Sequence, residues 1–121
     1  MAEENLALRT TAEVFEDHLR LAKAGDVEAD LERNYNPHCV ALSGRGIFHG
    51  HQGLRQLARM LAAELPDATF EYVTEQVWDR MAFLEWTGAG SGYRVRDGAD
   101  SFLIENGKII LQTIHYQVES T

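Results

Sequence analysis

The sequence contains few cysteines, few basic residues and no long apolar run. Cys39 is the single cysteine among 121 residues, which excludes an internal disulfide framework and a multi-cysteine zinc site. Asp and Glu outnumber Lys and Arg by 19 to 11, a net charge of −8. Nucleic acid and anionic membrane surfaces are therefore not expected as partners, because both require clustered positive charge. No apolar stretch approaches the ~18 residues that a membrane helix needs.

The remaining composition is that of an ordinary globular protein. Apolar residues make up 45% and charged residues 25% of the chain, which argues against disorder. The amino-terminal sequence MAEENLALRT is acidic and polar, unlike a signal or transit peptide. We therefore expect a cytoplasmic protein that forms one domain over residues 1–121, with a core of its own.

The first half of the chain predicts helices. Thr10 and Glu13 form a capping-box pattern at the start of a helix over Thr11–Ala24, and Gly25 is suited to end it. A second short helix is predicted from Asp26 to about Arg33, and a third over Gln52–Leu65 from its i, i+3, i+4, i+7 leucines and alanines.

The second half predicts strands, because the apolar period there changes to two. Four longer strands are expected, over Phe70–Trp78, Met81–Gly88, Asp100–Glu105 and Lys108–Val118, after shorter extended pieces near His38–Ser43 and Ile47–Phe48. Asn106-Gly107 is the strongest hairpin signal, since both residues tolerate positive φ. The predicted class is α+β, with one curved antiparallel sheet and its helices packed on one face.

Two ionisable residues occupy positions where the pattern calls for apolar ones. His18 lies within the apolar stripe of the first helix, and Asp100 alternates with Phe102 and Ile104. A buried carboxyl needs donors or stays protonated, and a neutral one can donate to a developing oxyanion. A buried histidine can do the same or carry a proton near neutral pH. Each also has a structural interpretation: His18 as a satisfied core residue, Asp100 as a carboxylate that bonds nearby backbone amides.

Other candidates depend on which strand faces point inward. Gln112, Ile114 and Tyr116 share one face of the last strand, which is expected either to line a pocket or to pack in the core. Tyr35 is a candidate for the wall of a pocket. The pattern does not determine whether Glu85 is buried or exposed. No metal is expected, because His49 and His51 have no nearby third ligand.

Four segments resemble the SnoaL-like branch of the nuclear transport factor 2-like superfamily, which includes ketosteroid isomerases and polyketide cyclases. They are Ala22–Asp26, Tyr35–Leu42, Phe48–Leu54 and Asp100–Ile109. The resemblance implies a cystatin-like cone, in which a curved sheet wraps around three helices from the amino-terminal half. It also implies an apolar pocket and a homodimer formed through the sheet.

The ketosteroid isomerase pattern implies roles for three positions. The Asp that holds the oxyanion falls on Asp100, and the Tyr that does so falls on His18. The general-base Asp of the family falls on Ser43, where a neutral hydroxyl cannot take a proton unless another group activates it. His18 itself or Glu85 would then have to serve as the base.

The leading hypothesis is a cofactor-independent acid/base enzyme acting on a small apolar molecule, of isomerase, cyclase, dehydratase or hydrolase type. His18 and Asp100 are its predicted catalytic residues. The predicted ligand-binding residues are Tyr35, Ser43, Glu85, Phe102, Gln112, Ile114 and Tyr116. The alternatives are a non-catalytic module that binds a small apolar ligand and a dimeric assembly domain.

Overall fold

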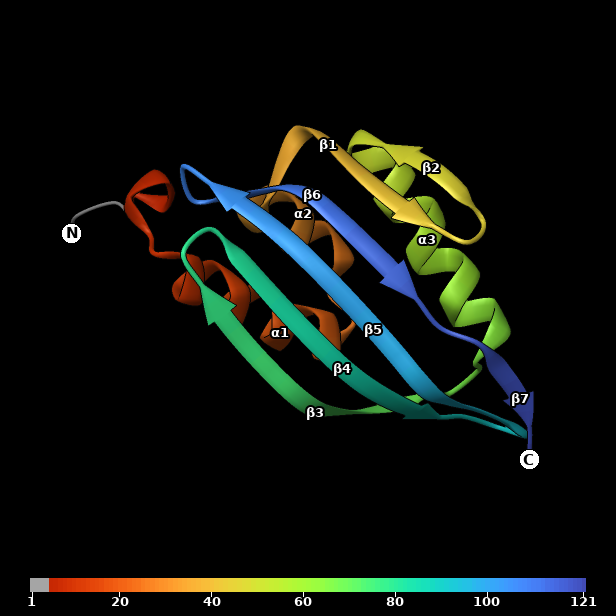
Figure 1. Cartoon of the computed structure of the whole chain (residues 1–121). Helices are drawn as coiled ribbons and strands as arrows, with labels where there is room; N and C mark the ends of the chain where they lie inside the picture. The colour runs from red at the N-terminus through yellow and green to blue at the C-terminus, as the bar shows by residue number, and fades with distance from the viewer. Residues whose placement is uncertain (1–4) are drawn as a thin grey trace.

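The computed structural model describes residues 5–121, so the first four residues of the amino-terminal segment considered above lie outside the described part. The elements follow in the order η1 (Leu6–Leu8), α1 (Thr11–Ala24), α2 (Val27–Asn34), β1 (Tyr35–Ser43), β2 (Gly46–His49), α3 (Gly50–Glu64), β3 (Thr69–Trp78), β4 (Met81–Ala89), β5 (Tyr93–Glu105), β6 (Lys108–His115) and β7 (Val118–Ser120). Helices therefore dominate the first half and strands the second, as predicted (Figure 1).

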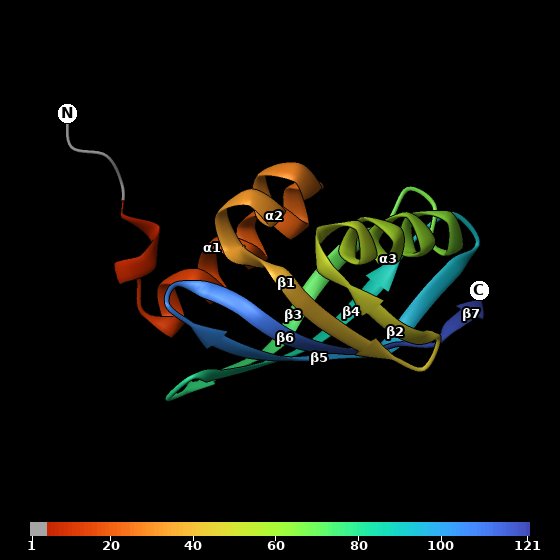
Figure 2. The same ribbon diagram turned by 90° about the horizontal axis from the view of Figure 1, so that it is seen from above.

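One curved sheet carries all three α-helices on the same face (Figure 2). Its strand order is β2-β1-β6-β5-β4-β3, and the short β7 pairs with β5. The predicted all-antiparallel sheet is wrong at one place, because β1 runs parallel to β6. Local apolar alternation cannot reveal this direction, since the two strands are joined only through the whole intervening chain.

The helix α1 is set by its ends and by its apolar stripe. Thr10 accepts from the Glu13 backbone N–H at 3.1 Å while the Glu13 carboxylate accepts from the Thr10 N–H at 2.8 Å, which confirms the capping box. Gly25 ends the helix in the left-handed conformation at φ 75°, which glycine adopts at little cost. Val14 and Phe15 are almost completely buried against the sheet. Burial of that stripe fixes which face of α1 looks inward.

The hairpin prediction is confirmed at Asn106-Gly107. These residues have φ of 51° and 72°, and Glu105 pairs with Lys108 on either side of them. Strand β5 begins at Tyr93 rather than Asp100, because its first part pairs with both β4 and β7. The predicted final strand is split, with β6 ending at His115 and β7 beginning at Val118.

The core lies between the inner face of the sheet and the three helices. Strict alternation along β4 buries Ala82, Leu84 and Trp86 and leaves the residues between them exposed. Leu54 and Leu57 of α3 pack on the same core. Among residues 5–121, no helix is long and apolar enough to cross a membrane. The curvature of the sheet leaves this core hollow where α1, α2 and α3 meet β4, β5 and β6.

Candidate functional site

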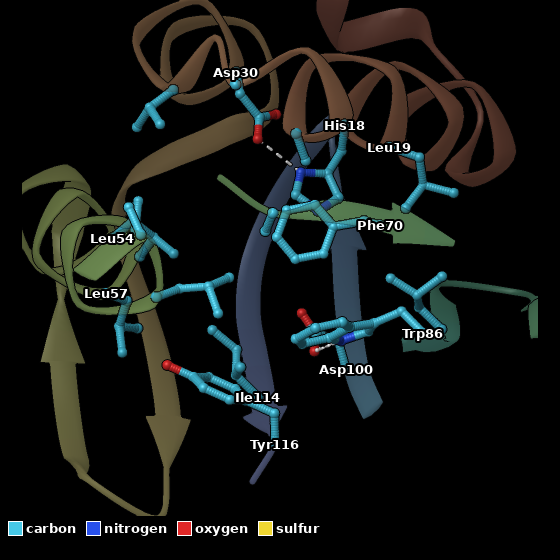
Figure 3. Close-up of a pocket in the computed structure, with 18 of the residues that line it drawn as sticks. His18, Leu19, Asp30, Leu54, Leu57, Phe70, Trp86, Asp100, Ile114 and Tyr116 are labelled. Atoms are coloured by element: carbon cyan, nitrogen blue, oxygen red, sulfur yellow. Dashed lines mark hydrogen bonds and ion pairs between the residues drawn. The ribbon is translucent and has the colours of Figure 1, made fainter. Parts of the chain in front are cut away.

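A cavity of about 430 Å³ occupies the space between the curved sheet and the helices. Figure 3 shows side chains that reach it from α1, α3 and the sheet. Most of its lining is apolar and includes Leu19, Leu54, Leu57, Leu61, Phe70, Leu84 and Ile114. A largely apolar cavity with a few convergent polar groups is typical of a small-molecule site.

His18 enters this cavity from the inner face of α1 and is 7% exposed. Its Nδ1 lies 2.8 Å from the Asp30 Oδ2, the contact drawn at the top of Figure 3. Burial alone lowers the pKa of His18, but the Asp30 carboxylate, with help from Asp100 and Asp17, raises it above the usual value of 6.5. The contact with Asp30 therefore favours the imidazolium form of His18.

The second ring nitrogen of His18 faces the cavity. Within residues 5–121, no group forms a hydrogen bond with His18 Nε2. In the same residues, every buried side-chain nitrogen or oxygen has a hydrogen-bond partner, so Nε2 is not a buried atom. Nε2 must therefore be accessible from the cavity, because that is the space that the His18 side chain lines. A ligand in the cavity meets a donor at this atom when His18 is charged and an acceptor when the neutral ring carries its proton on Nδ1.

Asp100 enters the cavity from β5 and is 8% exposed. Its Oδ1 accepts from the Trp86 indole N–H at 3.0 Å, and its Oδ2 accepts from the Gln112 amide at 3.0 Å. Burial raises the pKa of Asp100 to about 6, although both hydrogen bonds and the charge of His18 oppose the shift. A carboxyl with that pKa can exchange a proton near neutral pH.

Tyr35 and Gln112 form the supporting network on the sheet side. The Tyr35 hydroxyl donates to Gln112 Oε1 at 2.5 Å, which turns the amide nitrogen of Gln112 toward Asp100. Burial, followed by the charges of Asp30 and Asp100, raises the pKa of Tyr35 well above 10. Tyr35 therefore stays a neutral donor and also packs edge-on against the His18 ring, with centroids 5.7 Å apart.

Tyr116 presents its ring to the cavity while its hydroxyl is already occupied. The hydroxyl donates to Glu64 Oε1 at 2.8 Å and also accepts from Arg45. The Arg45 guanidinium lies 4.3 Å above the ring centroid. Tyr116 and Ile114 both line the cavity, as do Tyr35 and Gln112, so four of the seven predicted ligand-binding residues face it.

The other three predicted ligand-binding residues lie away from the cavity lining, so these placements correct the prediction. Glu85 is exposed on the outer face of β4, because strand alternation points Leu84 and Trp86 inward instead. Ser43 lies at the end of β1, where its hydroxyl accepts from the Arg45 backbone N–H at 3.1 Å. Phe102 is 2% exposed and packs behind His18, with ring centroids 5.1 Å apart. Neither Ser43 nor Glu85 is therefore positioned to act as the base.

Asp30 is the functional candidate that sequence reasoning missed. It lines the cavity and holds His18. Its signal lies in α2, where Val27, Asp30, Leu31 and Asn34 occupy the i, i+3, i+4, i+7 positions of one face. The periodicity argument used for α1, applied equally to α2, predicts that Asp30 faces the core. Its pairing with His18 depends on how α1 and α2 pack.

His18 and Asp100 belong to two separate hydrogen-bonded groups on one cavity. His18 bonds to Asp30, while Asp100 bonds to Trp86 and Gln112. Between residues 5 and 121, no group of three or more His, Cys, Asp or Glu side chains is arranged to hold a metal ion. The arrangement offers two proton-exchanging groups on different walls of one apolar chamber.

The helices on one face of a curved, unclosed mixed sheet define a protein of the nuclear transport factor 2-like class. The family model of the SnoaL-like domain matches residues 15–112, so the chain belongs to the SnoaL-like domain family. A comparison with curated proteins finds no match.

Solved structures share this fold at low identity. A candidate SnoaL-like polyketide cyclase from Mesorhizobium loti is 22% identical, with a TM-score of 0.69 over 89% of this chain and 100% of its own. An NTF-2 like protein of unknown function from Burkholderia xenovorans is 17% identical, with a TM-score of 0.74 over 88% and 82%. AclR, a candidate hydroxylase from Streptomyces galilaeus, is 13% identical, with a TM-score of 0.71 over 88% of each chain. At these identities the likeness establishes the fold alone.

Proposed function

We propose that this protein is a small-molecule enzyme that performs cofactor-independent acid/base chemistry, of isomerase, cyclase, dehydratase or hydrolase type. One observation carries the proposal: His18 from α1 and Asp100 from β5 line the same apolar cavity, each held by its own partners. A merely structural histidine or carboxylate has no need of an apolar chamber beside it. Two proteins of the same fold are named as a polyketide cyclase and a hydroxylase, and this supports the proposal by analogy of fold only.

In the proposed mechanism, Asp100 is the base and His18 the acid. The pKa of Asp100 near 6 leaves it ionised at neutral pH, yet basic enough to take a proton from carbon or oxygen. Against the effect of burial, the Asp30 carboxylate raises the pKa of His18 and so favours the charged ring, which carries a proton on Nε2. That proton stabilises the negative charge that develops on a substrate oxygen, or is delivered to it. Apolar walls strengthen both interactions by excluding water.

The proposed substrate is uncharged and largely apolar. Among the described residues that line the cavity, three are aspartates and one is histidine, and none is lysine or arginine. A carboxylate or phosphate in the chamber would therefore lose its water and face three carboxylates, and the one cationic group, His18, is already paired with Asp30. A neutral carbonyl or hydroxyl compound meets a donor at His18 Nε2 and an acceptor at Asp100, and its hydrocarbon part meets the leucines.

A substrate-independent test uses 5-nitrobenzisoxazole, a flat neutral probe. A base removes its C3 proton, the N–O bond breaks, and the product is a coloured cyanophenolate. We expect the protein to accelerate this reaction with a bell-shaped pH profile. The rate should rise through about pH 6 as Asp100 ionises and fall at higher pH as His18 loses its proton. His18→Asn should lower kcat by about 10²-fold and abolish the alkaline limb.

The matched control is His38→Asn, because His38 is exposed on β1 and should leave the rate unchanged. If the protein is no faster than free imidazole at equal concentration, the enzyme proposal is wrong. Quenching of tryptophan fluorescence by the probe without turnover would support the non-catalytic binding module instead, since Trp86 lines the cavity.

We propose further that two copies associate through the outer face of the sheet. The helices leave that face uncovered (Figure 2), and cross-strand pairing places Trp78, Met81, Leu103 and Leu111 in one apolar row across it. Trp78 is 83% and Met81 57% exposed in the single chain. An exposed apolar row of this kind is typical of an interface.

Light scattering after size exclusion measures the assembly. We expect twice the chain mass of 13.6 kDa for the wild type and a single chain mass for Met81→Glu, because a buried unpaired carboxylate is costly. Val73→Glu is the control, since Val73 is equally apolar and exposed but lies at the irregular part of the edge strand β3. A monomeric wild type at micromolar concentration would contradict the proposal.

A further inference from the structure

The segment ahead of α1 is joined to the cavity through Arg9. This residue follows η1, and its side chain is only 8% exposed. Its guanidinium donates to the backbone oxygens of Leu6, Arg33 and Gly107 at 3.2, 2.7 and 2.9 Å. Arg9 is therefore fixed where the amino-terminal segment, the end of α2 and the β5–β6 hairpin meet.

From Arg9 a chain of hydrogen bonds runs inward to the cavity. Arg9 Nη1 donates to Asn34 Oδ1 at 2.9 Å, with a longer contact of 3.4 Å to Asp17. Asn34 Nδ2 donates to Asp30 Oδ1 at 2.9 Å. Asp30 Oδ2 lies 2.8 Å from His18 Nδ1. Asn34 is completely buried and the two inner residues nearly so, so water does not compete for these bonds.

The chemistry of the four groups fixes the direction of every bond in this chain. A guanidinium only donates, so Asn34 must turn its oxygen toward Arg9 and its amide nitrogen toward Asp30. An ionised carboxylate only accepts, so His18 must carry a proton on Nδ1. When the ring is neutral, Nε2 then holds a lone pair, and this is the atom that faces the cavity. A flipped Asn34 amide would instead aim its oxygen at Asp30 and weaken that carboxylate's hold on His18.

We infer that Arg9 is a positioning residue for the site, which fixes the amide of Asn34 and thereby the tautomer and orientation of His18. The inference deepens the proposed function, because it rests on His18 as the cavity's proton carrier. Arg9 lies before the residues matched by the family model, 15–112. The amino-terminal segment of this chain therefore supplies part of the machinery of its site.

The charges that face His18 come from three elements. Asp30 approaches from α2, Asp100 from β5 and Asp17 from α1 itself, and all three favour the charged ring. Arg9 acts on His18 through Asn34 and Asp30. Replacing Arg9 therefore changes the geometry of the strongest of these contacts and leaves Asp100 where it is.

Nitrogen-15 NMR of histidine-labelled full-length protein tests this directly. Above the titration of His18, the wild type should show protonated Nδ1 and bare Nε2. Arg9→Met should give a mixture of tautomers and lower the pKa of His18 by roughly one unit. Arg20→Met is the matched control, since Arg20 also bonds Asp17 but is 64% exposed and does not contact Asn34. Its His18 tautomer and pKa should match those of the wild type.

Arg9→Lys separates positioning from packing. A lysine retains one charged donor for Asn34 but loses the contacts to Arg33 and Gly107, so it should lower stability while keeping the wild-type tautomer. A wild type with Nε2 protonated in the neutral ring overturns the inference even if Arg9→Met does not fold. So does an Arg9→Met protein with unchanged tautomer and pKa. Failure of the benzisoxazole reaction alone would contradict the proposed enzyme and leave this tautomer assignment standing.

Discussion

Asp100→Asn is expected to make the protein inactive and, above pH 6, more stable. In the proposed mechanism Asp100 is the base, and loss of a positioned base lowers kcat by about 10²–10⁴-fold. The asparagine side chain has the same shape as the aspartate it replaces. Its Oδ1 still accepts from Trp86, and rotation of the Gln112 amide by half a turn satisfies the new amide nitrogen. The Tyr35 hydroxyl, which donates to Gln112 Oε1 in the wild type, then accepts from the Gln112 amide nitrogen instead, and the loss of its acceptor offsets part of the gain.

The gain in stability follows from the pKa of Asp100. The folded protein raises that pKa from 3.8 to about 6, so the folded state holds a proton that the unfolded chain releases. The stabilisation from this proton is complete below pH 3.8 and is lost as pH rises to about 6. A shift of about 2.2 units corresponds to about 3 kcal/mol at 1.36 kcal/mol per unit. The free energy of unfolding of the wild type should therefore fall across this window by an amount of that order.

Urea unfolding at intervals from pH 4 to pH 8 measures the effect. The wild-type decline between pH 4 and pH 6 should be largely absent in Asp100→Asn, which should exceed the wild type by about 1–3 kcal/mol at pH 8. Glu85→Gln on the outer face of β4 is the control and should change neither stability nor turnover. Asp17, whose pKa is lowered to about 2 by Arg33 and Arg20 against the effect of burial, titrates below this window. Equal slopes in wild type and Asp100→Asn would contradict the assignment.

Gly98→Ala is expected to damage both the fold and the site. Gly98 pairs with Trp86 across β4 and β5, and the indole ring lies directly over it. A Cβ at position 98 would overlap that ring and stand 2.7 Å from Trp86 Nε1. The indole is held on its other sides by Phe70 and Tyr116, with ring centroids at 5.6 and 5.7 Å. It therefore has little room to move aside.

Displacement of the indole also breaks its hydrogen bond to Asp100. Overpacking and the lost bond together should lower the free energy of unfolding by about 2–3 kcal/mol. The base would lose its donor, and the rising limb of the pH–rate profile should move to higher pH. Gly44→Ala is the control, because a Cβ there meets no atom within 4 Å, and its stability should stay within about 0.5 kcal/mol of the wild type. Equal melting temperatures for the two variants would contradict this prediction, because they would show that the Trp86 indole can move aside without cost.

Three features of the fold follow from local rules. The capping box at Thr10 and Glu13, the glycine that ends α1 and the Asn106-Gly107 hairpin all depend on residues close together in the chain, and all are confirmed. The parallel pairing of β1 with β6 is not local. It is decided when the two strands meet across the folded chain, so no short window of sequence contains it.

The same division separates the parts of the site. The sequence by itself determined that His18 and Asp100 face inward, because each interrupts an apolar repeat whose period is that of its own helix or strand. The excess of 19 acidic over 11 basic residues also predicts that the protein has no general affinity for polyanions.

Only the tertiary structure decided which partners these two residues have. Asp30 reaches His18 because α2 folds back against α1, and Trp86 reaches Asp100 because Gly98 leaves room for its ring. The tertiary structure also shows that Ser43 and Glu85 lie outside the candidate site, because the end of β1 and the pleat of β4 point them away from the cavity. Periodicity reports which face of an element is buried. The neighbours on that face, and therefore the pKa values and the chemistry, depend on the packing of elements distant in sequence.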